Sequence, residues 1–205
     1  KSTDGGETWT ALTSAGSRNW RDVSSHDGVT VYGAAWGAWG NYIHKSTDGG
    51  ETWTALESAG SRQWYGVSSH DGVTVYGAAY NVWGTYIHKS TDGGETWTAL
   101  TSAGSRRWFD VSSHDGVTVY GAVGGNYIHK STDGGETWTA LTSAGSRNWR
   151  DVSSHDGVTV YGAAWGAWGN YIHKSTDGGE TWTALESAGS RQWYGVSSHD
   201  GVTVY

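Results

Sequence analysis

The sequence has no cysteine, no proline and no methionine among its 205 residues. The lack of cysteine excludes a disulfide framework and a thiolate metal site. For the same reason, cysteine usage gives no indication of whether the protein works in an oxidising or a reducing compartment. No apolar run approaches the ~18–20 residues of a membrane-spanning helix, so membrane insertion is not expected. The formal net charge is −7, and the chain therefore lacks the basic surface that a nucleic acid or an anionic membrane would need.

Glycine and large aromatic residues are abundant instead. The chain holds 33 Gly, 15 Trp and 12 Tyr, which is far too many aromatic side chains for a disordered segment. Set among Gly, Ser and Thr, they predict short strands joined by tight turns. No stretch places apolar residues at helical spacing, so helices are not expected. The chain opens at Lys1, and we expect it to be a piece of a longer protein or only the ordered part of one.

Internal repetition decides the fold class. The string Lys-Ser-Thr-Asp-Gly-Gly-Glu-Thr-Trp-Thr-Ala-Leu recurs through the chain and marks units 1–44, 45–88, 89–129, 130–173 and 174–205. Residues 1–76 recur without a change as residues 130–205. A period of about 40–45 residues is that of a four-stranded propeller blade, so residues 1–205 are predicted to form a single propeller domain.

Turn signals divide each unit into four strands. Asp27-Gly28 is a strong hairpin signal between two β-rich runs, because glycine accepts a positive φ. A Gly-rich loop and a second turn separate the runs that follow. The predicted strands of the first complete blade are residues 19–25, 29–35, 42–46 and 51–56.

The turn before the fourth strand resembles a known family. Residues 46–53 read Ser-Thr-Asp-Gly-Gly-Glu-Thr-Trp, which is similar to the Asp-box (BNR) pattern S/T-x-D-x-G-x-T-W. The resemblance implies that the box is the turn between the third and fourth strands of a propeller blade. The aspartate can brace such a turn by accepting bonds from its N–H groups, and the tryptophan can pack against the neighbouring blade. The five structural aspartates are Asp4, Asp48, Asp92, Asp133 and Asp177.

The predicted fold is therefore an all-β propeller of four-stranded antiparallel blades, with five blades in all; a longer parent protein with six or more blades is the alternative. The fifth blade is composite, with strands one and two from the C-terminal segment and strand four from the N-terminal segment. Twelve residues corresponding to 77–88 are missing from that blade. An unpaired strand edge is sticky, so self-association or completion by a strand from elsewhere is expected there.

Asp boxes are best known from sialidases, whose resemblance would call for an arginine triad, an acidic proton donor and a Tyr–Glu nucleophile pair. The chain offers arginines in its repeated Gly-Ser-Arg loops, namely Arg18, Arg62, Arg106, Arg147 and Arg191. A catalytic centre needs different residues converging at one place, which identical repeats around a ring do not supply. We therefore expect no catalytic residue and no enzymatic activity.

Histidine is the remaining candidate metal ligand. Five of the nine histidines stand in Ser-Ser-His-Asp-Gly turns and four in the third strands. A zinc site needs three or four ligands around one ion, whereas repeated positions on different blades lie far apart. Structural roles are therefore favoured, and no metal or cofactor is expected.

Two regions differ between units. The first follows the first-strand tryptophan and reads Arg21-Asp22, Tyr65-Gly66, Phe109-Asp110, Arg150-Asp151 and Tyr194-Gly195. These residues are expected to line the central channel. Asp22, Asp110 and Asp151 either form a partial acidic ring there or pair with Arg21 and Arg150, and the pairing is favoured. The second region is the loop between strands two and three, and its aromatic residues are Trp36, Trp39, Tyr80, Trp83, Trp165 and Trp168.

The loop aromatics and the loop arginines form the candidate ligand site. An aromatic ring can stack on the apolar face of a sugar while arginine and amide groups bond its hydroxyls. Glycans are thus the candidate partners of a non-enzymatic, multivalent, lectin-like propeller, which we expect outside the cell or on its surface. Alternatively, the aromatics seal the gaps between blades, and the chain is a structural or engineered scaffold, or a fragment of a longer repetitive surface protein, without a specific ligand.

Overall fold

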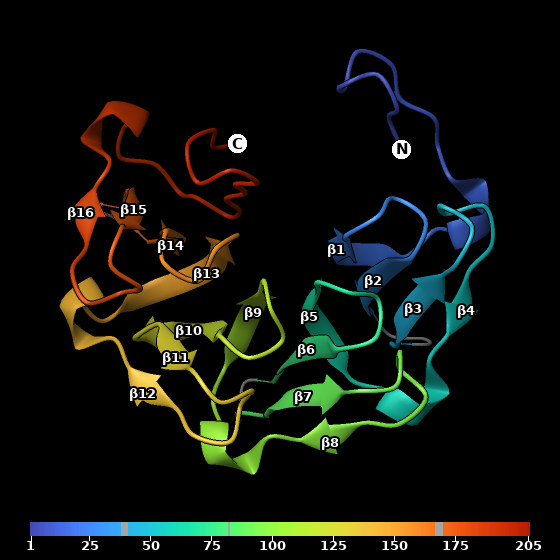
Figure 1. The fold of residues 1–205 in the computed structure, drawn as a ribbon, viewed down its shortest axis with the longest axis horizontal. Coiled ribbons are helices and arrows are strands. Elements are labelled where there is room, and N and C mark those ends of the chain that lie inside the picture. Colours follow the sequence, from blue (N-terminus) through green and yellow to red (C-terminus); the bar gives the residue numbers. More distant parts are fainter. Residues whose placement is uncertain (38–40, 82, 167–169) are drawn as a thin grey trace.

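The computed structural model describes residues 1–37, 41–81, 83–166 and 170–205. They form four antiparallel, four-stranded blades that radiate from a common centre as an open arc (Figure 1). The first strand of each blade is innermost. Pairing of β10 with β13 also joins blades three and four into one continuous sheet. The chain is thus a β-propeller in architecture, as the repeat period predicts.

The four blades have nearly the same strand bounds. Blade one holds β1 (Asn19–Ser25), β2 (Val31–Trp36), β3 (Ile43–Ser46) and β4 (Thr54–Ala55). Blade two holds β5 (Gln63–Ser69), β6 (Val75–Tyr80), β7 (Ile87–Ser90) and β8 (Thr98–Ala99). Blade three holds β9 (Trp108–Ser113), β10 (Val119–Asn126), β11 (His129–Ser131) and β12 (Thr139–Ala140). Blade four holds β13 (Arg147–Ser154), β14 (Val160–Trp165), β15 (Ile172–Ser175) and β16 (Thr183–Ala184).

The fourth strand is shorter than predicted, because the Asp box holds its first residues. Asp48 accepts bonds from the Thr52 amide at 2.8 Å and the Thr52 hydroxyl at 2.6 Å, and the Ser46 hydroxyl donates to it at 2.8 Å. These bonds lower the pKa of Asp48 to about 2. The Trp53 indole donates to the Gly50 carbonyl at 2.9 Å. Residues 51–53 are therefore part of the turn, and only Thr54–Ala55 pair as a strand.

Short 3-10 turns follow each of the four fourth strands, and a fifth lies at the same repeat position in the N-terminal segment, although no helix is expected from the sequence. They are η1 (Thr13–Ala15), η2 (Glu57–Ala59), η3 (Thr101–Ala103), η4 (Thr142–Ala144) and η5 (Glu186–Ala188). Each is a single turn closed by a glycine with positive φ, too short to show a helical apolar pattern in the sequence. No helix in the described part of the chain is long and apolar enough to cross a membrane.

The core lies between neighbouring blades. Trp64 of blade two is fully buried and shares a cluster with Tyr32 and Ile43 of blade one. Trp97 packs against Trp64 of its own blade, on the edge of the same cluster. The same arrangement recurs around Trp108 and Trp149. Each blade therefore needs a neighbour to cover its faces, as expected for stacked repeats.

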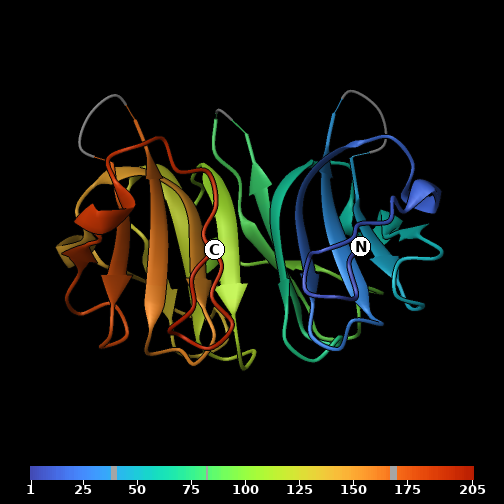
Figure 2. The same cartoon turned by 90° about the horizontal axis from the view of Figure 1, so that it is seen from above.

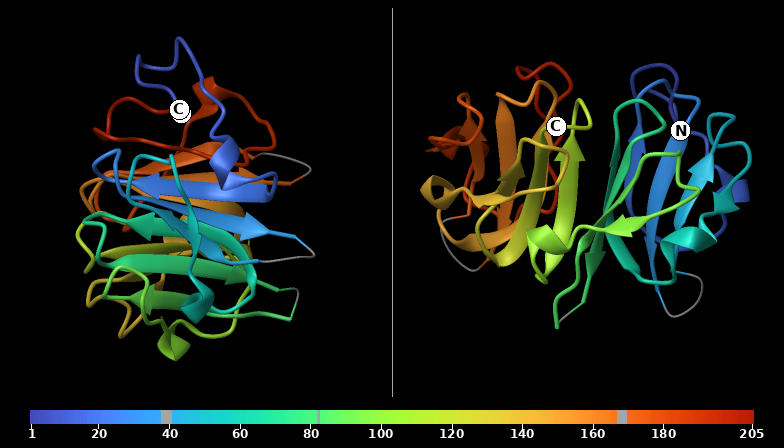
Figure 3. Two further views of the ribbon diagram at one scale, coloured as in Figure 1. Left: turned by 90° about the vertical axis from the view of Figure 1, so that its right-hand side faces the viewer. Right: turned by 60° about the horizontal axis from the view of Figure 1, so that its bottom comes forward.

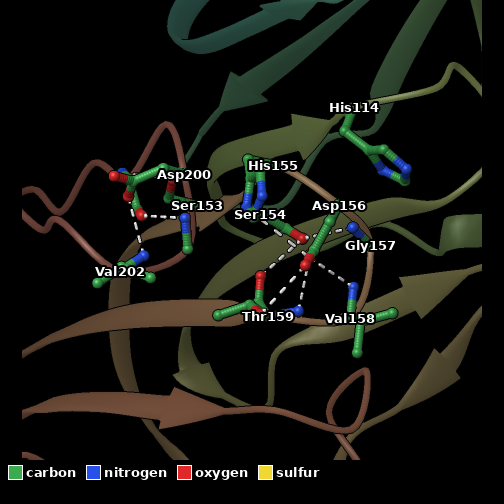
Figure 4. A network of polar contacts seen from close by, with 12 residues as sticks. His114, Ser153, Ser154, His155, Asp156, Gly157, Val158, Thr159, Asp200 and Val202 are labelled. Carbon is green, nitrogen blue, oxygen red and sulfur yellow. Dashed lines mark hydrogen bonds and ion pairs between the residues drawn. The ribbon is translucent and has the colours of Figure 1, made fainter.

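The Ser-Ser-His-Asp-Gly turns link strands one and two at the face opposite the aromatic loops (Figure 2). In blade four, Asp156 accepts bonds from the amides of Val158 at 2.9 Å and Thr159 at 2.6 Å (Figure 4). The Gly157 amide donates to Ser154 Oγ at 3.0 Å. Gly157 has φ +72° and lies under the His114 ring of the preceding blade, so the turn needs glycine on both grounds.

The fifth, composite blade is not assembled as a sheet. Residues 1–18 and 190–205 contain no strand, and both termini lie at the open side of the arc (Figures 1 and 3). Each terminal segment folds back on itself instead. Lys1 exchanges two backbone bonds with Thr10, and Ser197 exchanges two with Tyr205. Among the described residues, no strand pairs these two segments with each other.

Candidate functional site

The residue after the first-strand tryptophan occupies a β-bulge in every blade. In blade one, Trp20 pairs with Ala35 and Asp22 with Ala34, which leaves Arg21 as the extra residue. The same register shift occurs in the other three blades, at Tyr65, Phe109 and Arg150. Because a bulge re-aims the side chain that it carries, these variable residues are turned toward the neighbouring blade.

The bulge residues and the loop aromatics form one stacked series. The Arg21 guanidinium lies 4.9 Å from the Trp36 ring centroid and 5.0 Å from that of Tyr65 in blade two. The Tyr65 and Tyr80 rings are 4.6 Å apart. Further round, the stack passes from Phe109 through Arg150 to blade four. We call the whole set the aromatic arc: Arg21, Trp36, Tyr65, Tyr80, Phe109, Arg150, Trp165 and Tyr194.

The expected pairing of Arg21 and Arg150 with the channel aspartates is wrong. Both guanidinium groups stack on aromatic rings, with the guanidinium carbon 3.9–5.0 Å from the ring centroids. Among the described residues, the ion pairs that form are between histidine and aspartate within the turns. A cation over an aromatic face is attracted by the ring quadrupole, and here the bulge directs the arginine to that face.

The inner aspartates bond the backbone of the next blade instead. Asp22 accepts the Val67 amide at 2.8 Å, and Asp110 accepts the Val152 amide at 3.0 Å. Burial raises the pKa of Asp22 to about 7. Burial and the neighbouring Asp151 carboxylate hold the pKa of Asp110 well above its usual range. These carboxyl groups therefore act as protonatable links between blades.

The predicted loop aromatics divide into two groups. Trp36, Tyr80 and Trp165 are half-buried in the aromatic arc, and the Trp165 indole also donates to Gln192 Oε1 at 3.0 Å. Trp83 is different, because 90% of its surface is exposed. Trp39 and Trp168 lie outside the described residues.

The five loop arginines do not converge. Arg18 Nε donates to His44 Nε2 at 3.3 Å, Arg62 to the Ala59 carbonyl at 3.2 Å, and Arg147 to the Ala144 carbonyl at 3.3 Å. Each of these bonds stays within or beside the blade that the arginine opens. Arg191 is exposed next to Gly189, and Arg106 lies by Trp83.

The third-strand histidines pack inside the blades. His44 is almost fully buried, and its ring lies 5.2 Å from that of Trp20 in an edge arrangement. Burial, together with Arg18, lowers the pKa of His44 to about 4, so the ring is neutral at pH 7. Within the described ranges, no three His, Asp or Glu side chains lie close enough together to hold one metal ion.

One pocket brings several predicted site residues together. It has a volume of about 250 Å³ and lies between the β6–β7 loop and blade three, lined by Trp83, Gly84, Ser105, Arg106, Arg107 and residues 123–126. The backbones of Thr85 and Arg106 exchange bonds of 2.8 and 2.9 Å, which fixes the two loops side by side. The loop of unit three is three residues shorter than its counterparts, and this leaves the space beside Trp83 open.

Two features of this geometry, the role of Arg107 and the aromatic arc, are not predicted from the sequence. Arg107 stands where the other units have Asn or Gln, and its guanidinium donates to the Gly124 carbonyl at 3.1 Å. That single substitution, next to the shortened loop, is the signal that could have located the pocket. The aromatic arc depends on the β-bulges, and no local sequence pattern predicts these bulges.

Comparison with protein families agrees with the repeat pattern. The BNR/Asp-box repeat matches the chain at residues 1–11, 44–55, 88–99, 129–140 and 173–184. No curated protein sequence matches the chain.

Several solved structures share the fold. A GH74 enzyme from Niastella koreensis is 25% identical with a TM-score of 0.63, over 81% of this chain and 30% of that one. YCF48 bound to D1 peptide is 15% identical with a TM-score of 0.64, over 88% of this chain and 57% of that one. The GH74 xyloglucanase from Xanthomonas campestris is 13% identical with a TM-score of 0.57, over 91% and 43% respectively. The chain thus spans less than two thirds of each of these proteins.

Proposed function

We propose that this chain, which carries the BNR/Asp-box repeat at five places on a β-propeller fold, is a non-enzymatic binding module that recognises carbohydrate at its loop face. The observation that carries the proposal is the pocket beside Trp83. An exposed indole there offers its face to the apolar side of a pyranose. Arg107 and Asn126 line the same pocket and offer donors and an acceptor to sugar hydroxyls.

The arginine geometry supports binding rather than catalysis. A carboxylate clamp of the sialidase kind would need three guanidinium groups at one place. Arg18, Arg62 and Arg147 are instead engaged separately, each by groups beside its own blade. We accordingly propose that the module has no catalytic centre.

Multivalency and location follow from the proposed ligand. The Trp83 pocket is shallow, and a single such site would bind weakly. The shortened loop and Arg107 occur once in this chain, so avidity would come from several copies of the module presented together on a glycan-coated surface. We place the module outside the cell or on the cell surface for that reason.

A glycan array followed by calorimetry with the best-bound saccharide tests the proposal. Trp83→Ala and Arg107→Gln should each weaken binding at least about tenfold, equivalent to about 1.4 kcal/mol, and leave the melting temperature unchanged. Arg107→Gln introduces the residue found at positions 63 and 192 and is therefore compatible with the blade. If the array shows no bound saccharide, or if Trp83→Ala binds as well as the parent protein, the carbohydrate-binding proposal is wrong.

The second candidate is a purely architectural module without a specific ligand. It would be a natural or engineered scaffold, or a fragment of a longer repetitive surface protein. The aromatic arc favours it, because Trp36 and Trp165 bridge neighbouring blades rather than standing free. The exact recurrence of residues 1–76 as 130–205 favours it too, since selection for one ligand makes blades diverge. Such a module would bind no saccharide with or without Trp83.

For the complete module we propose a ring of five blades, the fifth built from residues 1–12 and 190–205. The two segments already sit on their neighbours in the way that the proposal requires. Lys1 and Leu12 approach Gly49 and Gly50 as Lys45 and Leu56 approach Gly93 and Gly94. At the other end, the Val196 amide donates to Asp151 at 2.8 Å, as the Val67 amide does to Asp22.

A further inference from the structure

Every complete contact between blades uses the same pair of anchors. The first is a third-strand isoleucine that lies over a second-strand glycine of the next blade. Ile43 covers Gly77, where an added Cβ would be 2.7 Å from Ile43 Cδ1, and Ile87 and Ile128 cover their glycines in the same way. The second anchor is a second-strand tyrosine. The Tyr32 hydroxyl donates to the carbonyls of Gly72 at 2.8 Å and Gly93 at 3.2 Å in blade two.

Blade one presents this receiving surface with neither anchor in place. The three atoms nearest to a Cβ added at Gly33 all belong to Trp20 and Trp53 of its own blade. No tyrosine hydroxyl in the described part of the chain reaches the carbonyls of Gly28 or Gly49. Val23 is 64% exposed, whereas its counterparts in the other blades are 2–3% exposed. We call this surface the open face.

A cavity of about 490 Å³ lies on the open face. Its lining includes Leu12, Trp20, Val23, Gly33 and Trp53, together with the charged residues Lys1, Arg21 and Asp22. Its walls are chiefly apolar, and it has room for the two missing side chains. At the complete contacts the equivalent space is filled by tyrosine, alanine and isoleucine from the preceding blade.

The N-terminal segment adds an unused hydrogen-bonding edge beside the cavity. In each complete blade, the leucine after the fourth strand donates its amide to the third-strand isoleucine, as Leu56 does to Ile43 at 2.8 Å. In the part of the chain that the structure describes, the Leu12 amide has no such acceptor. An extended peptide that carried an isoleucine into the cavity would supply this acceptor with its own backbone.

We propose that the open face is a docking site for an extended peptide with the sequence of the second and third repeat strands, such as residues 76–88. Tyr76 of the peptide would donate to Gly28 and Gly49, Ile87 would cover Gly33, and the peptide backbone would pair with residues 11–12. Tyr205, which matches Tyr76 in the repeated block, is 82% exposed and leaves the tyrosine position open to the peptide. The proposal rests on the five-blade ring proposed above, in which Tyr205 would take this position. Apolar filling of a preformed slot and main-chain bonds to a free edge act together in this mode of recognition.

A labelled synthetic peptide covering residues 76–88, titrated into the 205-residue chain, tests the proposal by fluorescence anisotropy. We expect saturable binding, with slower hydrogen exchange at the Leu12 amide. The same peptide with Ile87→Gly should bind at least about tenfold more weakly, because the side chain that would fill the apolar part of the cavity is removed. Absence of saturable binding, or equal binding by both peptides, would overturn the proposal.

Two variants of the protein locate the peptide. Val23→Lys places a charge on the open face at an exposed position, so the chain should fold normally and lose peptide binding. Val29→Lys is the matched control, because Val73 and Val117 remain about half exposed even where the contact is complete. Peptide binding that survives Val23→Lys would contradict the assigned site.

Sedimentation of the chain alone excludes the other occupant. A dimer that does not accept the peptide would mean that a second copy covers the open face, and the proposal would fail. Saccharide binding measured on the same samples separates this proposal from the carbohydrate function. The Trp83 pocket lies between blades two and three, so failure of one interaction leaves the other readable.

Discussion

The Asp22 carboxylate accepts a hydrogen bond from the backbone amide of Val67, 2.8 Å away in the next blade. Asp110 in blade three and Asp151 in blade four accept the same bond from the unit that follows each of them, from the amides of Val152 and Val196. Because burial raises the pKa of these carboxyl groups, the contacts between blades are coupled to proton uptake near the centre of the arc.

The inner aspartates predict that the protein loses stability as the pH rises. A carboxyl group whose pKa is raised on folding holds its proton more tightly in the folded chain than in the unfolded one. Its contribution is complete below the ordinary pKa near 4 and is lost as the pH rises through the folded pKa, about 7 for Asp22. We expect the free energy of unfolding in urea to fall by on the order of a few kcal/mol between pH 5 and pH 8.

Asp110→Asn is the matched variant for that prediction. The amide oxygen can still accept the Val152 N–H, while its NH₂ group can donate to Asp151 as a protonated carboxyl would. The variant should therefore lose less stability above pH 7 than the parent does. Parallel pH profiles of the two proteins would contradict the assignment.

The Asp boxes predict a loss of stability at the acid end. The bonds from Thr52 and Ser46 lower the pKa of Asp48 to about 2, so its contribution is present above pH 4 and is lost as the pH falls through 2. Asp48→Ala removes all of these bonds at once and should lower the melting temperature at pH 7. Glu51→Ala, an exposed residue of the same box, is the control and should melt like the parent.

Trp36→Ala is expected to destabilise the protein rather than to affect a ligand. The ring contacts Arg21 and, across the blade boundary, Tyr65. Truncating this half-buried ring should cost roughly 1–3 kcal/mol in urea unfolding, less than the loss of a fully buried tryptophan. An unchanged unfolding midpoint would show that the aromatic arc does not hold blades one and two together.

Gly66→Ala should destabilise the inner strands through a steric clash. A Cβ at this position would lie 2.7 Å from the Asp110 Cα, a backbone atom that cannot rotate away. Overpacking of this kind costs about 1–3 kcal/mol. Gly195→Ala is the matched control, because its nearest neighbour is the Asp151 carboxylate at 3.1 Å. Equal unfolding curves for the two variants would contradict the steric account.

Local signals in the sequence were enough to place most of each blade. The first strand was predicted at 19–25 and is observed as Asn19–Ser25, because a glycine loop and an Asp-Gly turn bound it on both sides. The fourth strand was overestimated, since the bonds that hold residues 51–53 in the box turn were not part of the strand pattern.

The candidate site was harder to read, because it depends on contacts between units. Arg21 and Asp22 are adjacent in sequence and suggest an ion pair, yet the bulge sends one to an aromatic face and leaves the other on a backbone amide. The Trp83 pocket arises from a shortened loop in the following unit. A reading of one unit at a time contains neither relationship.

Contacts between the first strands of neighbouring blades restrict the order in which the repeat units can follow one another. Gly66 leaves room for Asp110 in the blade that follows, and an added carbon there would strike the Asp110 backbone. Where two aspartates follow one another, at Asp110 and Asp151, burial and the neighbouring carboxylate raise the pKa of Asp110. Units with nearly the same sequence therefore differ in which unit can follow them without a steric clash. Recombination that copies whole blocks keeps compatible neighbours together, and the identical blocks 1–76 and 130–205 have the form that such copying would leave.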